Sequence, residues 1–358
     1  MSDTYLKLTA YFGERQRVGS QFVAEAMLDL FAERNIATSV MLRGIASFGP
    51  RHIIRSDQSL TLSEDPPVAV VGVDTETAVT ALLDDVIGMT TRGLITLERA
   101  RLMTGDLAAT PIPDGGDSVK LTIYVGRRRR VDGAPALYAV CDLLHRHHFA
   151  GASVFLGVDG TAGGRRRRAH FFSRNIDVPL MIVAVGTGEQ ARQVLPQLGS
   201  LMDRPLVTIE RMQVCKRDGK LIARPPALPA VDDRGREVRQ KLMVYTSEAT
   251  LHDGVPIHRA LIRRLWESGT ASGATVLRGI WGFHGDHEPH GDKLIQFGRQ
   301  VPVTTIIVDT PDSIARSFDI VEEVTGTHGL VTCEMVPALL MLDGGRRQGS
   351  LDLADYRY

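Results

Sequence analysis

The chain has 358 residues, of which 43% are hydrophobic and 23% are charged, which is enough apolar material for more than one sizeable core. Its 42 basic and 42 acidic residues give a formal net charge of zero, which excludes a global attraction to nucleic acid, membranes or acidic substrates. Any electrostatic recognition must therefore come from local clusters of charge.

The cysteines and the N-terminal residues indicate the cellular compartment of the protein. Cys141, Cys215 and Cys333 lie far apart without metal-type spacing, so we expect buried thiols in a reducing environment. The N-terminal stretch contains no apolar signal core, and no run reaches the roughly 20 apolar residues that a membrane helix needs. These features predict a cytoplasmic protein.

The first elements follow a simple order. A strand, "LKLTAYFG" (residues 6–13), precedes "FVAEAMLDLFAERN" (22–35), whose apolar residues recur on one helical stripe. A second strand, "SVMLRGIASFG" (39–49), leads into a long loop that ends at Pro67, and the apolar strand "PPVAVVGVD" (66–74) follows. A second helix is expected next, and "GLITLERA" (93–100) reads as the last strand.

The same order recurs twice more. The opening strand returns as "VKLTIYVG" (119–126) and "QKLMVYTS" (240–247), and the closing strand returns as "PLVTIERM" (205–212) and "GLVTCEMV" (329–336). Thr187 and Gln190 have the spacing of a capping box, and Thr310 followed by Pro311 predicts a helix start. The predicted domains are repeat 1 (1–103), a linker (104–118), repeat 2 (119–215), a linker (216–238), repeat 3 (239–342) and a flexible tail (343–358).

Each repeat therefore reads β, α, β, long loop, β, α, β, which is the ferredoxin-like order of an α+β fold. That order places both helices on one face of a four-stranded antiparallel sheet. The third strands "VAVVGV", "VPLMIVAV" and "VTTIIV" lack the alternating polar residues of a solvated face, so both faces should be buried. We expect the three open faces to pack together as an intramolecular pseudo-trimer with clefts between the repeats.

Three fragments carry a resemblance to a known family. The stretch "ATVLRGIWGFHG", the "VPV" strand after a long loop and the terminal "GLVT-E" strand resemble the domain-of-unknown-function family 190, whose fold is similar to that of PII signalling proteins. The resemblance implies binding of adenine nucleotides or other small effectors in clefts between subunits, with the long loop between strands two and three as the reporter. It also implies genomic association with membrane fluoride exporters. Because the trimer would lie within one chain, a monomer would suffice.

The long loops differ in chemistry. Repeat 1 carries Arg43, Arg51, His52 and Arg55 in its loop. Repeat 2 carries a run of four arginines in its loop and a second run after its first strand; the residues are Arg165, Arg166, Arg167, Arg168, Arg127, Arg128, Arg129 and Arg130. Because arginine binds phosphate or carboxylate bidentately, an anion site is one interpretation; a solvated charge run and contact with nucleic acid are the others.

The repeated "LRG" fragment also has two interpretations. Gly44 and Gly279 could provide a positive φ as the chain leaves strand two, or Arg43 and Arg278 could point into a cleft and bind an anionic effector. Repeat 2 departs from the pattern with Leu156 and Gly157. The candidate effector-binding residues are Arg43, Gly44, Arg278, Gly279, Arg127, Arg128, Arg165, Arg166 and Arg167.

The loop of repeat 3 contains three histidines spaced by three residues, His284, His287 and His290, among carboxylates. This spacing is compatible with a zinc, nickel or copper site, and also with a solvated polar loop, because its glycines and proline break any helix that would align them. Glu98, Glu210 and Glu334 recur in the last strands and are expected to be exposed partners of basic groups at the strand edges.

Catalytic motifs are missing from the sequence. No serine, cysteine or histidine occurs in a nucleophile motif, and no paired carboxylates stand out across the repeats. Because repeated catalytic sites should keep their reacting residues in all three repeats, we expect no enzymatic activity. The favoured function is a PII-like regulatory protein that binds an anionic small molecule, an adenine nucleotide being the first candidate. The alternatives are a metal-dependent enzyme or metal sensor built on the histidine loop, and an accessory partner of a membrane ion exporter.

Overall fold

The computed structural model describes residues 4–51, 53–56, 65–104, 107, 117–162, 165–168, 179–202, 206–284, 290–291 and 301–355. Among these residues, no helix is long and apolar enough to cross a membrane.

Repeat 1 is built from one main sheet and its helices. Its elements are β1 (Tyr5–Gly13), β2 (Arg17–Val18), β3 (Gln21–Phe22), α1 (Val23–Glu33), β4 (Thr38–Phe48), β5 (Arg55–Ser56), β6 (Pro67–Thr75), α2 (Glu76–Thr80), α3 (Leu83–Met89) and β7 (Arg92–Thr104). The sheet is antiparallel, in the order β4-β6-β1-β7.

Repeat 2 has the corresponding elements and an extension. They are β8 (Ser118–Gly126), β9 (Arg130–Val131), β10 (Ala134–Pro135), α4 (Ala136–Arg146), β11 (Gly151–Leu156), β12 (Asp159–Ala162), β13 (Arg165–Arg168), β14 (Pro179–Thr187), α5 (Gly188–Leu201), β15 (Leu206–Arg211), β16 (Gln213–Arg217) and β17 (Lys220–Leu221). Its strand order is β11-β14-β8-β15.

Repeat 3 closes the chain. It contains β18 (Arg239–Ser247), β19 (Leu251–His252), β20 (Val255–Pro256), α6 (Ile257–Ser268), β21 (Ala274–Arg278), β22 (Trp281–His284), β23 (His290–Gly291), β24 (Pro302–Asp309), α7 (Pro311–Thr325), β25 (Leu330–Val336), β26 (Ala338–Asp343) and β27 (Arg346–Ser350). Its order is β21-β24-β18-β25, the same as in the other repeats.

The helix starts follow local sequence signals. Thr187 and Gln190 form the predicted capping box of α5, with each side chain bonded to the other residue's backbone N–H. At α7, the Thr310 side chain accepts a hydrogen bond from the backbone N–H of Ser313, and proline occupies the first helical turn. Both helix starts are therefore confirmed.

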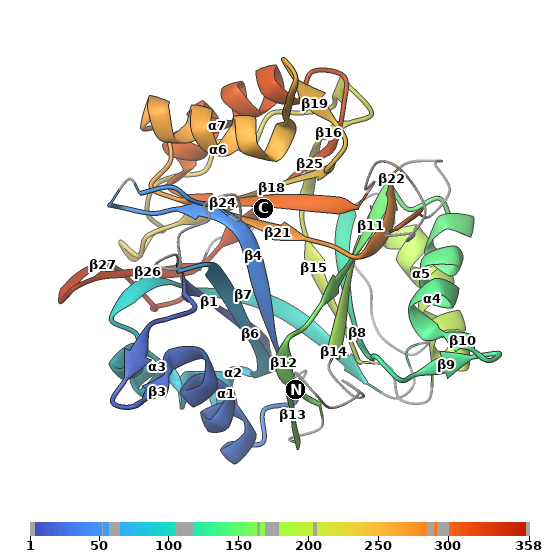
Figure 1. Ribbon diagram of the computed structural model, residues 1–358, viewed down its shortest axis with the longest axis horizontal. Coiled ribbons are helices and arrows are strands. Elements are labelled where there is room, and N and C mark those ends of the chain that lie inside the picture. The colour runs from blue at the N-terminus through green and yellow to red at the C-terminus, as the bar shows by residue number, and fades with distance from the viewer. Residues whose placement is uncertain are drawn as a thin grey trace.

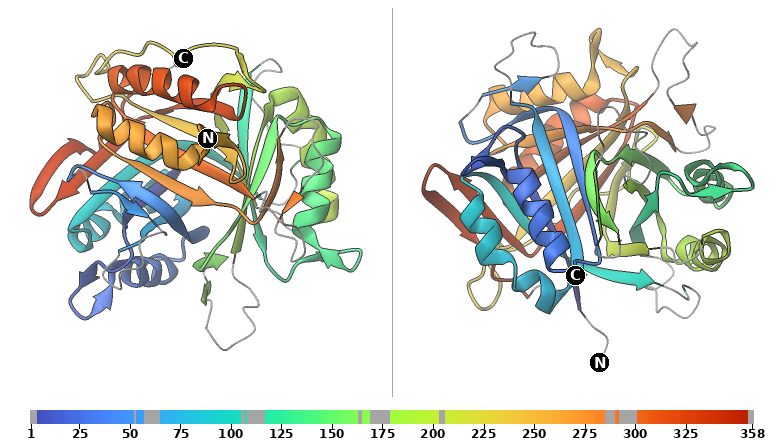
Figure 2. Two further views of the ribbon diagram at one scale, coloured as in Figure 1. Left: turned by 45° about the horizontal axis from the view of Figure 1, so that its top comes forward. Right: turned by 60° about the horizontal axis from the view of Figure 1, so that its bottom comes forward.

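The repeats are joined by two cycles of strand pairing. In the first cycle, β4 pairs with β21 of repeat 3, β22 of repeat 3 pairs with β11 of repeat 2, and β12 of repeat 2 returns to β4. In the second cycle, β7 pairs with β15, β16 pairs with β25, and β26 returns to β7. Each sheet is thereby extended by strands of its neighbours, and the three sheets curve around a common centre with the helices outside (Figures 1 and 2).

The core has four parts. Three clusters of buried apolar residues each contain mainly the helix and sheet residues of one repeat, together with some from a neighbouring repeat, such as Phe283, Leu340 and Phe48. A fourth cluster contains residues of all three repeats, including Leu42, Phe155 and Leu277. The second face of each sheet is therefore buried against the other repeats.

The end of the chain differs from the prediction of a flexible tail over 343–358. Strand β27 pairs with β26 from Leu339–Ser350 to Asp343–Arg346, and the buried Ala354 donates its N–H to the carbonyl of Pro337. The backbone N–H of Asp355 also donates to Asp232 in the second linker. Pairing of β27 with β26, which itself pairs with β7 of repeat 1, thus orders a segment that lacks an apolar period of its own.

Candidate functional site: an inter-repeat cleft and a buried charge ring

A cleft of about 180 Å³ lies between repeats 1 and 3. Repeat 1 contributes the end of β1, residues 47–51, Ile53, Arg55 and the start of β7, while repeat 3 contributes the start of β21 and part of β24. The end of β26 completes the wall. The cleft therefore depends on the pairing of β4 with β21 and of β26 with β7.

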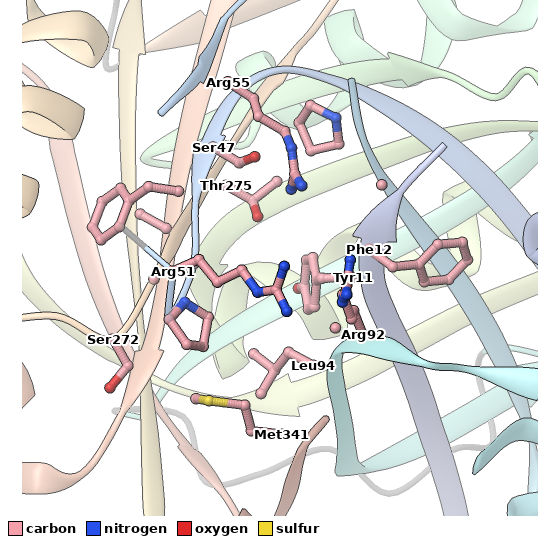
Figure 3. Close-up of a pocket in the computed structure, with 18 of the residues that line it drawn as sticks. Tyr11, Phe12, Ser47, Arg51, Arg55, Arg92, Leu94, Ser272, Thr275 and Met341 are labelled. Carbon is pink, nitrogen blue, oxygen red and sulfur yellow. The ribbon is translucent and has the colours of Figure 1, made fainter. Parts of the chain in front are cut away.

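Three arginines of repeat 1 give the cleft its charge. All three line the cleft; in Figure 3 the Arg51 and Arg92 side chains lie beside Tyr11, and the Arg55 guanidinium lies nearer Thr275. Arg51 Nε lies 3.0 Å from Asp343 Oδ1, and Arg92 Nε lies 3.7 Å from the same oxygen. Arg55 is 3.9 Å from Asp65. Three cations therefore face two carboxylates, which leaves an excess of one positive charge.

The rest of the lining is mainly apolar. Tyr11, Leu94 and Met341 line the cleft together (Figure 3). Ile306 and Val308 line it from repeat 3. Burial raises the pKa of Tyr11 to about 12, so its hydroxyl is a neutral donor at physiological pH. Cations beside an apolar surface suit a ligand with an anionic end and a flat apolar part.

The predicted arginines of the "LRG" fragments have other partners. Arg43 is paired with Glu14, and Arg278 is paired with Glu248. The residues lining the cleft include neither arginine. In the structure these two arginines are therefore held by carboxylates of their own repeats, whereas Arg51 and Arg55 of the same repeat 1 loop face the cleft.

The glycines of the same fragments serve close packing, and the expectation of a positive φ is wrong. Gly44 and Gly279 are not among the residues with positive φ. A Cβ on Gly44 would lie 2.8 Å from Pro67 Cγ and 2.9 Å from the carbonyl oxygen of Val276. A Cβ on Gly279 would lie 2.7 Å from Pro302 Cγ and 3.0 Å from the carbonyl oxygen of Val154. At both positions, the absence of a side chain allows a strand of the neighbouring repeat to pack directly against the glycine backbone.

The arginine runs of repeat 2 lie at two sites. Arg127 and Arg128 are exposed in the turn after β8. The backbones of Arg165, Arg166 and Arg167 belong to β13, which pairs with β12 at Ala162, Thr161 and Gly160. His52 of the repeat 1 loop lies outside the described residues.

The histidine loop is described in part. His284 is half-buried in β22, where it pairs with Gly151, and the backbone of His290 pairs with Gly282 across the β22–β23 hairpin. His287 lies outside the described residues. Metal binding by these histidines stays a prediction.

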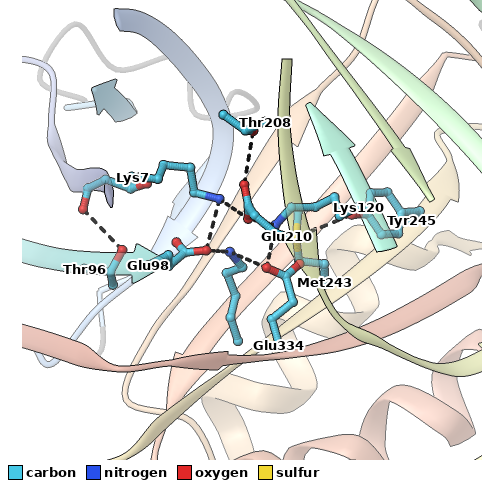
Figure 4. A network of polar contacts seen from close by, with 11 residues as sticks. Lys7, Thr96, Glu98, Lys120, Thr208, Glu210, Met243, Tyr245 and Glu334 are labelled. Atoms are coloured by element: carbon cyan, nitrogen blue, oxygen red, sulfur yellow. Dashed lines mark hydrogen bonds and ion pairs between the residues drawn. The ribbon is translucent and has the colours of Figure 1, made fainter. Parts of the chain in front are cut away.

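A ring of six charged side chains lies at the centre of the molecule. Lys7 contacts Glu98 of its own repeat at 3.0 Å and Glu210 of repeat 2 at 2.5 Å (Figure 4). Lys120 contacts Glu210 at 2.6 Å and Glu334 of repeat 3 at 2.5 Å. The third lysine closes the ring, because it contacts Glu334 at 3.0 Å and also Glu98; this residue is Lys241.

The glutamates of this charge ring are buried, so the expectation that they are exposed is wrong. Their side chains are 3–4% exposed, and each contacts ammonium groups of two repeats. One oxygen of each carboxylate lies within 4.8 Å of the other two, a spacing that a metal ion could use. The lysines already supply the opposing charge, so the cluster is a network of ion pairs.

The charges in the ring hold each other ionised. Burial alone would raise the pKa of Glu210, but the charges of Lys120 and Lys7 outweigh it and lower this pKa to about 2. The pKa of Glu98 is lowered in the same way, chiefly by Lys241 and Lys7 against the effect of burial. Burial lowers the pKa of Lys7, yet Glu210 and Glu98 raise it well above 10.5 overall. All three groups are thus charged at neutral pH.

The sequence contained a signal for the ring. Lys7, Lys120 and Lys241 occupy the same position in three otherwise apolar strands. In the antiparallel register these lysines face the repeated glutamates, as Lys7 faces Glu98. A lysine in the middle of each buried strand needs a buried carboxylate, and only the last strands offer one in every repeat.

Three separate parts of the chain match one family model. The model is DUF190, described as "Uncharacterized ACR, COG1993", and it matches residues 5–102, 118–214 and 239–338. The chain belongs to the DUF190 family. One relative of this DUF190 chain is the UPF0166 protein of Aquifex aeolicus (strain VF5), which is 36% identical over 108 residues, or 30% of this chain and 99% of the relative. That relative has the length of one repeat.

Two solved structures show remote similarity to the DUF190 chain. An anthrone oxidase-like protein has a TM-score of 0.16 and 10% identity over 62% of this chain and 96% of that chain. A mutant of the ferredoxin protease FusC in complex with Arabidopsis ferredoxin has a TM-score of 0.18 and 8% identity over 91% of this chain and 62% of that chain. Scores of this size support no conclusion about fold or function.

Proposed function

We propose that this DUF190 chain is a PII-like regulatory protein in which three ferredoxin-like repeats form an intramolecular pseudo-trimer. An anionic small molecule binds in the cleft between repeats 1 and 3, and the segment between β4 and β6 reports its presence. The proposal gains support from the shared strand order of the repeats and from their two closed cycles of strand pairing.

The observation that carries the proposal is the convergence of Arg51, Arg55 and Arg92 beside an apolar wall (Figure 3). An adenine nucleotide has the matching parts, because its base can pack on Tyr11, Leu94 and Met341 while its phosphates pair with the guanidinium groups. Adenine nucleotides are therefore the first ligands to test.

The reporting segment follows from the same residues. Arg51 and Arg55 belong to the connection between β4 and β6, so a ligand that binds them also restrains this connection. Such a restraint is a change that a protein partner can recognise. A membrane ion exporter as that partner stays a prediction.

Isothermal titration calorimetry with ATP, ADP, AMP, pyrophosphate and citrate tests the proposal. We expect at least one nucleotide to bind, and we expect Arg51→Ala combined with Arg55→Ala to weaken binding about tenfold or more, because each charge-assisted hydrogen bond contributes about 1.5–3 kcal/mol.

The matched control is Arg263→Ala combined with Arg264→Ala on α6, which removes the same charge from an exposed surface away from the cleft. This control should bind like the wild type. Unchanged affinity in the Arg51 and Arg55 variant would place the site elsewhere. Absence of binding by every probe would reject the proposed function.

A further inference from the structure

One carboxylate already occupies the cationic end of the cleft. Asp343 Oδ1 is 3.0 Å from Arg51 Nε and 3.7 Å from Arg92 Nε, and the aspartate side chain is 32% exposed. Asp343 comes from β26, at the far end of the chain from both arginines. The two guanidinium groups therefore hold an anion that the protein itself supplies.

A tight hairpin turn fixes the position of this carboxylate. Asp343 pairs with Arg346 across the turn, and the two residues between them are Gly344 and Gly345, with φ values of 58° and 95°. Such a two-residue turn requires positive φ at both central positions, which glycine allows. The backbone N–H of Gly344 donates to the carbonyl of Thr91, one residue before Arg92. The turn is thereby docked beside the arginines that its aspartate contacts.

We propose that Asp343 is an internal competitor for the anion-binding position of the cleft, and that it makes the cleft select ligands with two or more negative charges. This inference rests on the proposed function. A monocarboxylate that displaces Asp343 replaces one singly charged carboxylate by another, so it gains little. A phosphate or diphosphate group brings more charge and more acceptor oxygens, and it can pair with Arg51, Arg92 and Arg55 at once.

The ligand class is therefore a phosphorylated or otherwise multiply charged molecule. Displacement of the Asp343 side chain by a ligand also affects the β26–β27 hairpin, because Asp343 is the residue at which the hairpin turn begins. When a ligand takes the arginines, the turn loses its side-chain attachment and retains the backbone hydrogen bond from Gly344 to Thr91.

Calorimetry at constant ionic strength and pH 7.5 tests the inference with ADP, pyrophosphate and acetate as probes. In the wild type, we expect ADP or pyrophosphate to bind at least tenfold more tightly than acetate. In Asp343→Asn, their affinity should rise about 3- to 10-fold, because exposed ion pairs to two arginines no longer compete. Asp319→Asn is the control, since it removes the same charge from another surface ion pair with an arginine, and it should leave the affinities unchanged.

Asp343→Ser is a second variant that removes the charge without an amide, and the thermal unfolding midpoint of each variant confirms folding. Equal or weaker binding of ADP and pyrophosphate in both Asp343 variants overturns the inference but leaves the proposed function standing. The inference is also overturned if the wild type binds acetate as tightly as it binds ADP and pyrophosphate. If no probe binds any of the chains, the inference and the proposed function fall together.

Discussion

Gly44 and Gly279 lie where a carbonyl oxygen of a neighbouring repeat approaches the backbone. A side chain at Gly44 would meet the carbonyl oxygen of Val276, and one at Gly279 would meet that of Val154. Neither oxygen can move alone, because each belongs to a strand. The contact between repeats therefore depends on the absence of a Cβ atom at both glycines.

We expect Gly44→Ala to lower the free energy of unfolding by about 1–3 kcal/mol, the usual effect of adding a methyl group to a closely packed site. Gly88→Ala is the control, because Gly88 lies in α3, has ordinary φ and would place its Cβ in open space. That change should be neutral or stabilising by up to about 1 kcal/mol, as expected for alanine in a helix. Urea denaturation measures both values, and equal stabilities would contradict the packing argument.

At the scale of single residues, the sequence predicted what depends on neighbours along the chain. The helix starts at Thr187 and Thr310 are confirmed because their partners lie three residues away. The exposure of Glu98 was predicted wrongly because its second lysine partner belongs to repeat 3. Arg51 was recognised in the loop of repeat 1, but Asp343, its partner in the cleft, lies 292 positions away.

The extension strands β16 and β26 join the repeats at the scale of elements. β16 follows the last main strand of repeat 2 and pairs with β25, and β26 follows the last main strand of repeat 3 and pairs with β7. Ala338, Leu340 and Leu342 of β26 are buried in the core of repeat 1. Because β7 would otherwise present this edge to solvent, β26 protects repeat 1 from pairing with other chains.

A chain that ends at Pro337 should therefore be destabilised and prone to association. It loses the edge strand and the buried side chains of Leu339, Leu340 and Leu342, each worth about 1.5–3 kcal/mol, together with those of Ala338 and Ala354. We expect a lower thermal midpoint and concentration-dependent oligomers in analytical ultracentrifugation. A chain that ends at Asp355 retains all described contacts of the tail and should behave like the wild type. If the shorter chain stays monomeric with an unchanged midpoint, β26 does not protect the edge.

The main elements of each repeat follow from apolar periodicity, so the sequence predicted them in the right order. The extensions could not be predicted in this way. The second linker is rich in proline, glycine and charge, yet Lys216 in β16 is buried and donates to Thr325 of α7. β27 contains arginine, glutamine and glycine, so its strand character comes from pairing with β26.

The whole molecule is organised around the charge ring and the central apolar cluster, to which every repeat contributes. Each lysine of the ring bridges a glutamate of its own repeat and one of another. Removing a single member leaves a buried charge without its full complement, which costs about 3–5 kcal/mol in comparable ion pairs. The stability of any one repeat is therefore coupled to the presence of the other two.

The ring makes stability depend on pH in a specific direction. Because the pKa of Glu210 is lowered from 4.5 to about 2, its contribution is complete above about pH 4.5 and is lost as the pH falls toward 2. The pKa of Lys7 is raised, so its pH dependence runs in the opposite direction. Its contribution to folding stability is complete below pH 10.5 and is lost as the pH rises further. We expect Glu210→Gln to cost about 3–5 kcal/mol at pH 7 and progressively less toward pH 2, where the wild-type carboxyl is also neutral.

Guanidinium denaturation of wild type and Glu210→Gln between pH 2 and pH 7 measures this difference. Glu189→Gln is the control, because Glu189 forms an exposed pair with Arg192 one turn away, and its effect should be small at every pH. A penalty for Glu210→Gln that stays constant down to pH 2 would show that the carboxylate charge contributes nothing to stability.

The pairing of β26 with β7 also has a consequence for biosynthesis. Repeat 1 leaves the ribosome before the strand that covers its outer edge and before Met341 and Asp343 of its cleft, which follow the four main strands of repeat 3. The nascent chain thus carries a repeat 1 whose β7 edge stays uncovered until β26 has emerged. A chain that stops before β26 lacks the Met341 side of the arginine cleft, so the whole cleft can form only once β26 has been made.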